Sequence, residues 1–255
     1  MQCRIVSIPA CCWTRTAADN ALILGHRNSE WTGHGPILEQ DIALSNIALD
    51  LLGQARNFYQ YAANILLNGS TEDSFAYHRN EREFKNTLLV ELPNGDWGKT
   101  ILRQFFISAY QFLLYGRLKA TQDSTIAAIA EKSLKEVTYH LRWSSEWVIR
   151  LGDGTEESQQ RMQQALDQLW PYTGELFIPT SYEIIAAENG YGTNISLLKE
   201  PWLDRVNAIL QEATLSVPEN TWMQQGGKTG THSEHLGYLL AEMQYLQRSY
   251  PNSEW

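Results

Sequence analysis

The 255-residue sequence has very little cysteine. Its three cysteines, Cys3, Cys11 and Cys12, lie at the N-terminal end, so the rest of the chain holds neither a disulfide framework nor a Cys-x-x-Cys zinc site. Such usage is typical of a reducing compartment, and we expect a cytoplasmic protein. The sequence also lacks an apolar run of about eighteen residues and a signal-peptide pattern near its start. We therefore expect no transmembrane helix and no membrane partner.

Positive charge is scarce as well. Lys and Arg number 20 against 29 Asp and Glu, which gives a formal net charge of −9. A nucleic-acid backbone needs a basic face on its partner, so nucleic acid is not expected as a ligand. The alternating pattern of β-strands is also absent, whereas apolar residues recur every three or four positions. The sequence predicts an all-α protein, and no break in composition marks a second domain.

Periodicity, turn residues and caps set the expected helices. The long helices are expected over 19–32, 36–67, 97–119 and 125–151, and shorter ones over 79–89, 156–170, 181–188, 201–215 and 231–249. We expect residues 1–18 to be an atypical N-terminal extension. Residues 19–255 are expected to form a single helical domain.

The second long helix carries a polar row beside its apolar stripe. The stripe consists of Leu44, Ala48, Leu51, Ala55, Phe58, Ala62 and Ile65. The row consists of Asn46, Asp50, Gln54 and Asn57. Polar groups this close to a core cost free energy unless they are hydrogen-bonded. In four-helix carboxylate bundles, metal ligands occupy such positions as Glu residues and Glu-x-x-His pairs. Here the placement fits a metal site, but the residue types do not.

Two histidine patterns also suggest metal chemistry. Glu136 and His140 share a helix face at a spacing of four, where a di-iron helix uses three, and a core histidine with hydrogen-bond partners is the favoured interpretation. His232 and His235 lie one turn apart. The segment Thr231-x-x-Glu234 fits a helix capping box, which gives this region a structural role and makes a metal site improbable.

A third pattern is Gly-Lys-Thr within residues 226–230. A phosphate-binding loop needs a further glycine at the position of Trp222 and a preceding strand, and this sequence offers neither. Nucleotide binding is therefore not expected. The alternative that this segment is a flexible basic loop, in contact with a partner or a charged ligand, is retained.

Several blocks of sequence, in the same order, resemble one known family. They are 28–34, 42–57, 90–96, 135–142, 226–237 and 240–248. These blocks span the chain from about residue 19 to its end and resemble the C subunits of the phenylacetyl-CoA epoxidase complex. The resemblance implies a ferritin-like long-helix bundle with additional C-terminal helices. It also implies a non-catalytic structural subunit that pairs with a homologous A subunit. That A subunit holds the di-iron centre and works with other subunits and a reductase in aerobic phenylacetate degradation.

The resemblance also assigns the positions that hold iron in the catalytic homologue. In this chain they are Glu30, Leu51, Gln54, a third-helix position near Ser108, Val137 and His140. Leucine and valine cannot ligate a metal, and an amide brings no charge to balance two irons. We expect no catalytic residue, no cofactor and no metal in this chain, and the di-iron centre in its partner. Instead, Glu30, Asp50, Gln54 and His140 should hydrogen-bond to one another or to nearby Arg and Tyr.

Three functions are therefore compared. The chain is a structural subunit of a multicomponent oxygenase, a ferritin-like metalloprotein with an unusual active site, or a stand-alone helical binding protein. The ligand substitutions speak against the second. The aromatic content and the family blocks favour the first over the third. If the first is right, the isolated chain exposes its partner surface and should form a homo-oligomer.

Overall fold

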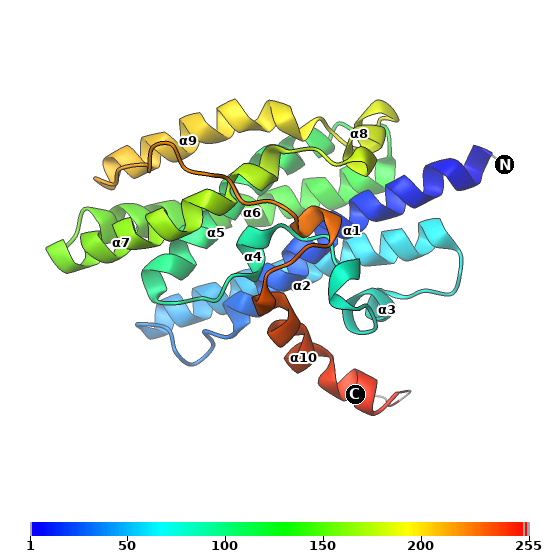
Figure 1. Ribbon diagram of the computed structural model, residues 1–255, viewed down its shortest axis with the longest axis horizontal. Coiled ribbons are helices and arrows are strands. Elements are labelled where there is room, and N and C mark those ends of the chain that lie inside the picture. Colours follow the sequence, from blue (N-terminus) through cyan, green and yellow to red (C-terminus); the bar gives the residue numbers. More distant parts are fainter. Residues whose placement is uncertain (1, 252, 254–255) are drawn as a thin grey trace.

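The computed structural model describes residues 2–251 and 253, and the regular structure there is entirely helical (Figure 1). The α-helices are α1 (Gln2–Ser29), α2 (Leu38–Leu66), α3 (Glu72–Tyr77), α4 (Leu88–Glu91), α5 (Trp97–Leu118), α6 (Ser124–Gly152), α7 (Glu156–Leu169), α8 (Ser181–Glu188), α9 (Lys199–Glu212) and α10 (Glu234–Ser249). Short 3-10 turns, among them η1 (Glu81–Glu83), η3 (Gly174–Phe177) and η4 (Ile195–Leu198), lie between them. The described residues contain no strand, so the predicted all-α class is confirmed.

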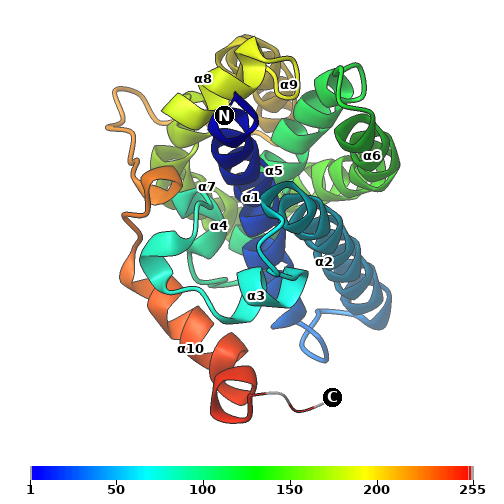
Figure 2. The ribbon, with the colours of Figure 1, turned by 90° about the vertical axis from the view of Figure 1, so that its right-hand side faces the viewer.

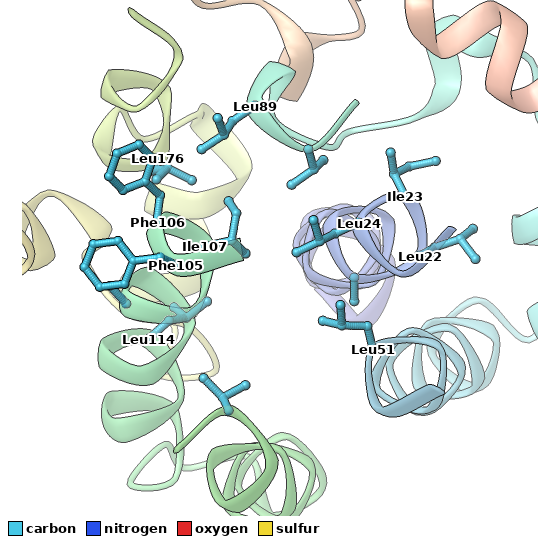
Figure 3. Packing of buried hydrophobic residues seen from close by; sticks show 14 of the residues in the cluster. Leu22, Ile23, Leu24, Leu51, Leu89, Phe105, Phe106, Ile107, Leu114 and Leu176 are labelled. Carbon is cyan, nitrogen blue, oxygen red and sulfur yellow. The ribbon is translucent and has the colours of Figure 1, made fainter. Parts of the chain in front are cut away.

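Four long helices, α1, α2, α5 and α6, form the bundle. The antiparallel pair α1 and α2 packs closely at Gly25, where an added Cβ would lie 3.2 Å from the Ala48 carbonyl oxygen and 3.3 Å from the Leu51 Cβ. Figure 2 shows α1 in the middle of the other helices. Figure 3 shows Leu51 pointing from α2 toward α1, and Leu24 of α1 facing Ile107 of α5. The predicted ferritin-like bundle is therefore present.

The later helices extend this bundle. α7 and α9 pack on α5 and α6, α8 packs on α1, and α10 contacts α3 and α4 and stands away from the long helices (Figure 1). Four aromatic rings join α5 to the later segments, with centroids 5.3 to 5.9 Å apart: Phe106, Trp170, Phe177 and Trp202. The buried Trp202 indole N–H also donates to the Phe106 carbonyl oxygen at 3.0 Å. The segments around Trp170, Phe177 and Trp202 are thus integral to the core.

The first helix begins earlier than predicted. α1 runs without interruption from Gln2 to Ser29 and includes Pro9, so the boundary expected at residue 19 falls inside a helix. Cys11 and Trp13 are buried in the core, at 2% and 4% exposure. The segment from residue 10 onward therefore packs with the bundle as part of α1.

The segment between α2 and α5 also differs from the prediction. One helix was expected over 79–89, but the chain forms α3, the turn η1 and the short α4 instead. The cause lies in the fully buried Asp19 of α1. Its carboxylate accepts hydrogen bonds from the Tyr59 hydroxyl at 2.5 Å, from the two terminal nitrogens of Arg79 at 3.0 and 2.5 Å, and from the Lys85 backbone N–H at 2.7 Å. These four residues, here called the Asp19 cluster, draw the segment against α1 and α2 in an irregular path.

Candidate functional site

The site that the sequence singled out lies where α2 meets α6. Hydrogen bonds join the two helices along a line that we call the α2–α6 seam. From one end to the other, its pairs are Gln40 with Trp143 and Trp147, Asp50 with His140, Gln54 with Glu136, and Tyr61 with Asp123. Along the seam the residue numbers increase on α2 and decrease on α6, because the two helices are antiparallel. Two members of the polar row of α2, Asp50 and Gln54, therefore pair with α6.

The middle of the seam contains its most buried groups. The His140 side chain is fully buried, and its Nε2 lies 3.0 Å from Oδ2 of Asp50, whose side chain is 39% exposed. The Gln54 amide is bonded at both ends: its Nε2 donates to Glu136 at 2.9 Å, and its Oε1 accepts from the Tyr115 hydroxyl at 3.1 Å. Asp50, Gln54 and His140 thus have the hydrogen-bond partners that the sequence predicted.

A second polar row, on α5, was missed by the sequence analysis. Its members are Gln104, Ser108, Gln111 and Tyr115, all of them buried. Gln104 accepts from the Asn28 amide of α1 at 2.7 Å and donates to the Ser108 hydroxyl at 2.9 Å. Burial raises the pKa of Tyr115 above its usual value, which keeps its hydroxyl a donor. The spacing of four, three and four residues on an apolar helix was the signal that could have revealed this row.

The positions that the resemblance assigns to iron ligands do not come together as one group. Leu51 and Val137 are fully buried in the apolar core. Gln54 and His140 lie in the seam, and Ser108 lies in the α5 row. Glu30 lies apart, after the last turn of α1. Its carboxylate accepts from Arg27 and from Asn94, both at 2.8 Å.

Helix packing explains the place of Glu30. The α1 residue against Leu51 is Gly25, more than one turn before Glu30, so the carboxylate points to the end of the bundle. Arg27 is the nearby Arg partner that the sequence allowed for. The structure does not bring Glu30 to Asp50, Gln54 or His140.

The donor set does not fit a pair of irons. Leu51 and Val137, which the resemblance assigns to ligand positions, are apolar. In the seam, Gln54 pairs with Glu136 and His140 Nε2 with Asp50, while His140 Nδ1 has no partner among the described residues. Within the described residues, no group of three or more His, Cys, Asp and Glu side chains is placed to hold a metal ion. Two irons need several anionic oxygens to balance their charge. The two carboxylates of the seam, Asp50 and Glu136, are already paired with His140 and Gln54.

This chemistry gives a first prediction. After expression in iron-supplemented medium, the purified chain should carry far less than one iron per molecule by elemental analysis. The reason is that apolar Leu51 and Val137 stand at positions that the resemblance assigns to carboxylate ligands. Stoichiometric iron whose spectrum changes in a His140→Leu variant would contradict the prediction and favour the metalloprotein alternative.

The second histidine pattern has a structural role, in a cluster here called the Glu91 pocket. His232 Nδ1 lies 2.7 Å from Glu91 Oε2, and its Nε2 lies 3.0 Å from the Phe84 carbonyl oxygen. The Glu91 carboxylate also accepts from the Asn86 amide at 2.8 Å and from the Ser233 backbone N–H at 2.6 Å. The His232 and Glu91 side chains are both fully buried. The pocket thus attaches the start of α10 to α4.

The Glu91 pocket also corrects the predicted cap. α10 begins at Glu234 with Ser233 as its N-cap residue, so no box forms between Thr231 and Glu234. Burial by itself lowers the pKa of His232. The hydrogen bond and charge of Glu91, with the Phe84 carbonyl, outweigh it and raise that pKa above 6.5. Both ring nitrogens face acceptors, which is the arrangement of an imidazolium.

The Gly-Lys-Thr loop is not a free basic segment. Lys228 is buried, and its Nζ donates to the Glu183 carboxylate at 2.8 Å and to the Ile178 carbonyl at 2.6 Å. The buried Glu175 carboxylate accepts from the backbone N–H groups of Gly226 at 2.8 Å and Lys228 at 3.2 Å. The lysine charge is therefore paired inside the fold.

The long-helix bundle and its polar seam define a ferritin-like helical protein, in which Leu51 and Val137 lie in the apolar core and Gln54 and His140 lie in hydrogen-bonded pairs. The model of a family described as phenylacetic acid catabolic protein matches residues 11–255, and the chain belongs to this family. A similar protein is the C subunit of 1,2-phenylacetyl-CoA epoxidase from Escherichia coli (strain K12). It is 49% identical over 243 residues, which cover 95% of this chain and 98% of that protein. Among the described residues, no helix is long and apolar enough to span a bilayer.

Proposed function

We propose that this chain is the non-catalytic structural subunit of a multicomponent 1,2-phenylacetyl-CoA epoxidase. In this role it pairs with and stabilises a homologous A subunit that holds the di-iron centre, together with the other subunits and a reductase, in the cytoplasm. The observation that carries the proposal is an intact bundle with Leu51 and Val137 in its core at ligand-aligned positions. The 49% identical relative, itself one component of an epoxidase, supports a place in such a complex.

The outer face of α2 supports the pairing. Leu38, Ile42 and Leu49 recur along this face and are 71%, 52% and 65% exposed, although α2 already buries its other side in the bundle. A helix with apolar residues on two faces is usually covered on both. Beside them, an added Cβ at Gly53 would meet nothing within 4 Å, so another backbone can approach closely. We propose that the A subunit packs on this α2 face.

A charge on this face should prevent pairing. When the chain is co-expressed with the A subunit, we expect the two to co-elute through an interface of more than ~2,000 Å² in total. Leu49→Asp should weaken the pairing by about 30-fold or more, because a buried interface residue of this kind contributes on the order of 2 kcal/mol or more. The matched control is Leu197→Asp in η4, which is 63% exposed and lies away from α2.

The measurements are size-exclusion chromatography with light scattering, with circular dichroism to show that each variant is folded. Without the A subunit, the wild-type chain should self-associate through the same face and show a mass above 29.1 kDa at micromolar concentration. Leu49→Asp should return it toward the monomer. A monomeric wild type that gains no stability from the A subunit would remove the case for a structural partner. If Leu49→Asp and Leu197→Asp weakened pairing with the A subunit equally, the outer α2 face would not be the interface.

A further inference from the structure

A small cavity lies between α1, α5 and the segment that contains α8. Its volume is about 30 Å³, and its walls come from α1, α5, η3, α8 and η4. Most of the lining is apolar, with Trp13, Ile107 and Leu176 among its residues. A water molecule needs roughly 10–15 Å³ of such volume, and a small organic molecule needs several times more than this cavity offers. The size therefore restricts the occupant to one or two molecules of water.

Two polar side chains of α5, Gln111 and Tyr110, line this cavity. Gln111 is 4% exposed, and its Oε1 is a buried acceptor with no hydrogen bond to any described residue. Its amide already interacts with the hydroxyl of Tyr115. The neighbouring Tyr110 packs its ring on Phe177, with the ring centroids 5.9 Å apart, and also lines the cavity. Burial raises the pKa of Tyr110, so this hydroxyl stays protonated and able to donate. A buried unpaired acceptor is rare in native proteins and usually signals a bound water.

We infer that this cavity is a binding site for an ordered water molecule, which donates to Oε1 of Gln111 and accepts from the hydroxyl of Tyr110. The charged residue in the lining, Glu183, is already engaged by Lys228 in a buried ion pair. Because the two charges balance each other, neither is left to attract an anion or a cation into the cavity.

The water would complete a polar chain across the bundle. From the cavity the chain runs through Gln111 and Tyr115 to Gln54, and from Gln54 to Glu136 in the α2–α6 seam. With the water in place, the Gln111 Oε1 acceptor also has a hydrogen-bond partner. A fully satisfied network rigidifies a core, whereas a half-satisfied one weakens it. The site thus supports the polar interior of this bundle and does not depend on the proposed partner.

Two measurements on the full chain test the site. A crystal structure at a resolution that shows other buried waters should contain a density peak about 2.7–3.0 Å from Gln111 Oε1 inside the cavity. Oxygen-17 relaxation dispersion of bulk water has an amplitude that reports the number of long-lived internal waters. In Gln111→Met this amplitude should fall by the contribution of one water molecule. Tyr110→Phe should shorten the residence of that water. The controls are Gln160→Met and Tyr238→Phe, because both residues are exposed and lie outside the cavity.

Each outcome decides the inference. Density in the wild type and loss of one slow water in Gln111→Met, but not in Gln160→Met, would establish the site. A wild-type cavity without density would overturn it. An unchanged dispersion in a folded Gln111→Met variant would also overturn it. If Gln111→Met fails to fold, the wild-type crystal structure and the Tyr110→Phe dispersion still decide.

Discussion

Replacing Arg79 by methionine is expected to lower the free energy of unfolding by about 3–5 kcal/mol, because the substitution leaves the buried Asp19 carboxylate without its cation. The side chains are 7% and 0% exposed, and the guanidinium donates two hydrogen bonds to the carboxylate. Equilibrium denaturation in urea, followed by circular dichroism, measures the change. The loss should be large because the Asp19 cluster joins α1 and α2 to the segment before α5.

The chain provides a matched control for this prediction. Arg56 pairs with Glu72 at 3.4 Å, but its side chain is 68% exposed. An exposed pair contributes about 0–1 kcal/mol, so Arg56→Met should change stability little. The double variant of Asp19→Asn with Arg79→Met should be less destabilised than the sum of the single variants. Equal effects at Arg79 and Arg56 would show that burial does not set the strength of the Asp19 cluster.

The second large effect concerns the Glu91 pocket. At pH 6, His232→Leu should lower the free energy of unfolding by about 3–5 kcal/mol, because it leaves the buried Glu91 carboxylate without its cationic partner. In the wild type the pKa of His232 is raised above 6.5 on folding. Its contribution to stability is therefore fully present below pH 6.5 and is lost as the pH rises through the folded-state pKa.

A denaturation series from pH 6 to pH 9 tests this dependence. The gap in stability between the wild type and His232→Leu should narrow as the pH rises. An exposed histidine is the control, and His34→Gln should leave the pH profile unchanged. A gap that is constant or widens with pH would contradict an imidazolium in the Glu91 pocket. Loss of protease resistance at α10 should accompany the loss of stability, because His232 and Ser233 hold the start of that helix.

The long helices could be predicted from the sequence because each buries one face, and the buried face appears as apolar residues every three or four positions. The expected helix over 97–119 is α5 (Trp97–Leu118), and the one over 36–67 is α2 (Leu38–Leu66). The start of α1 was missed because buried threonines interrupt its apolar period. Thr14 and Thr16 are buried, and their hydroxyls donate to carbonyls of their own helix, a contact that the sequence does not reveal. Polar residues that satisfy themselves locally look like surface residues in a periodicity analysis.

Features of the site that depend on the position of a residue within one helix could be predicted. Features that depend on how two helices pack against each other were missed. The burial of Leu51 and the pairing of Gln54 follow from their places on α2. The place of Glu30 depends on the axial position of α1 relative to α2, and no local sequence pattern indicates this position. The contact of His232 with Glu91 joins positions 141 residues apart. Such pairs follow from the packed fold and could not be read from spacing.

The α2–α6 seam has a mechanical consequence. Apolar contacts such as those of Val137 tolerate small shifts, but the hydrogen bonds of the seam are directional. Sliding α2 along α6 by one helical turn, about 5.4 Å, would break these pairs together and leave His140 and Gln54 buried without partners. The seam therefore resists shear between the two helix pairs, as a bridging metal would in a metal-loaded bundle. This stiffness comes from side chains alone, so the shape of the outer α2 face should be the same whether iron is plentiful or scarce in the cell.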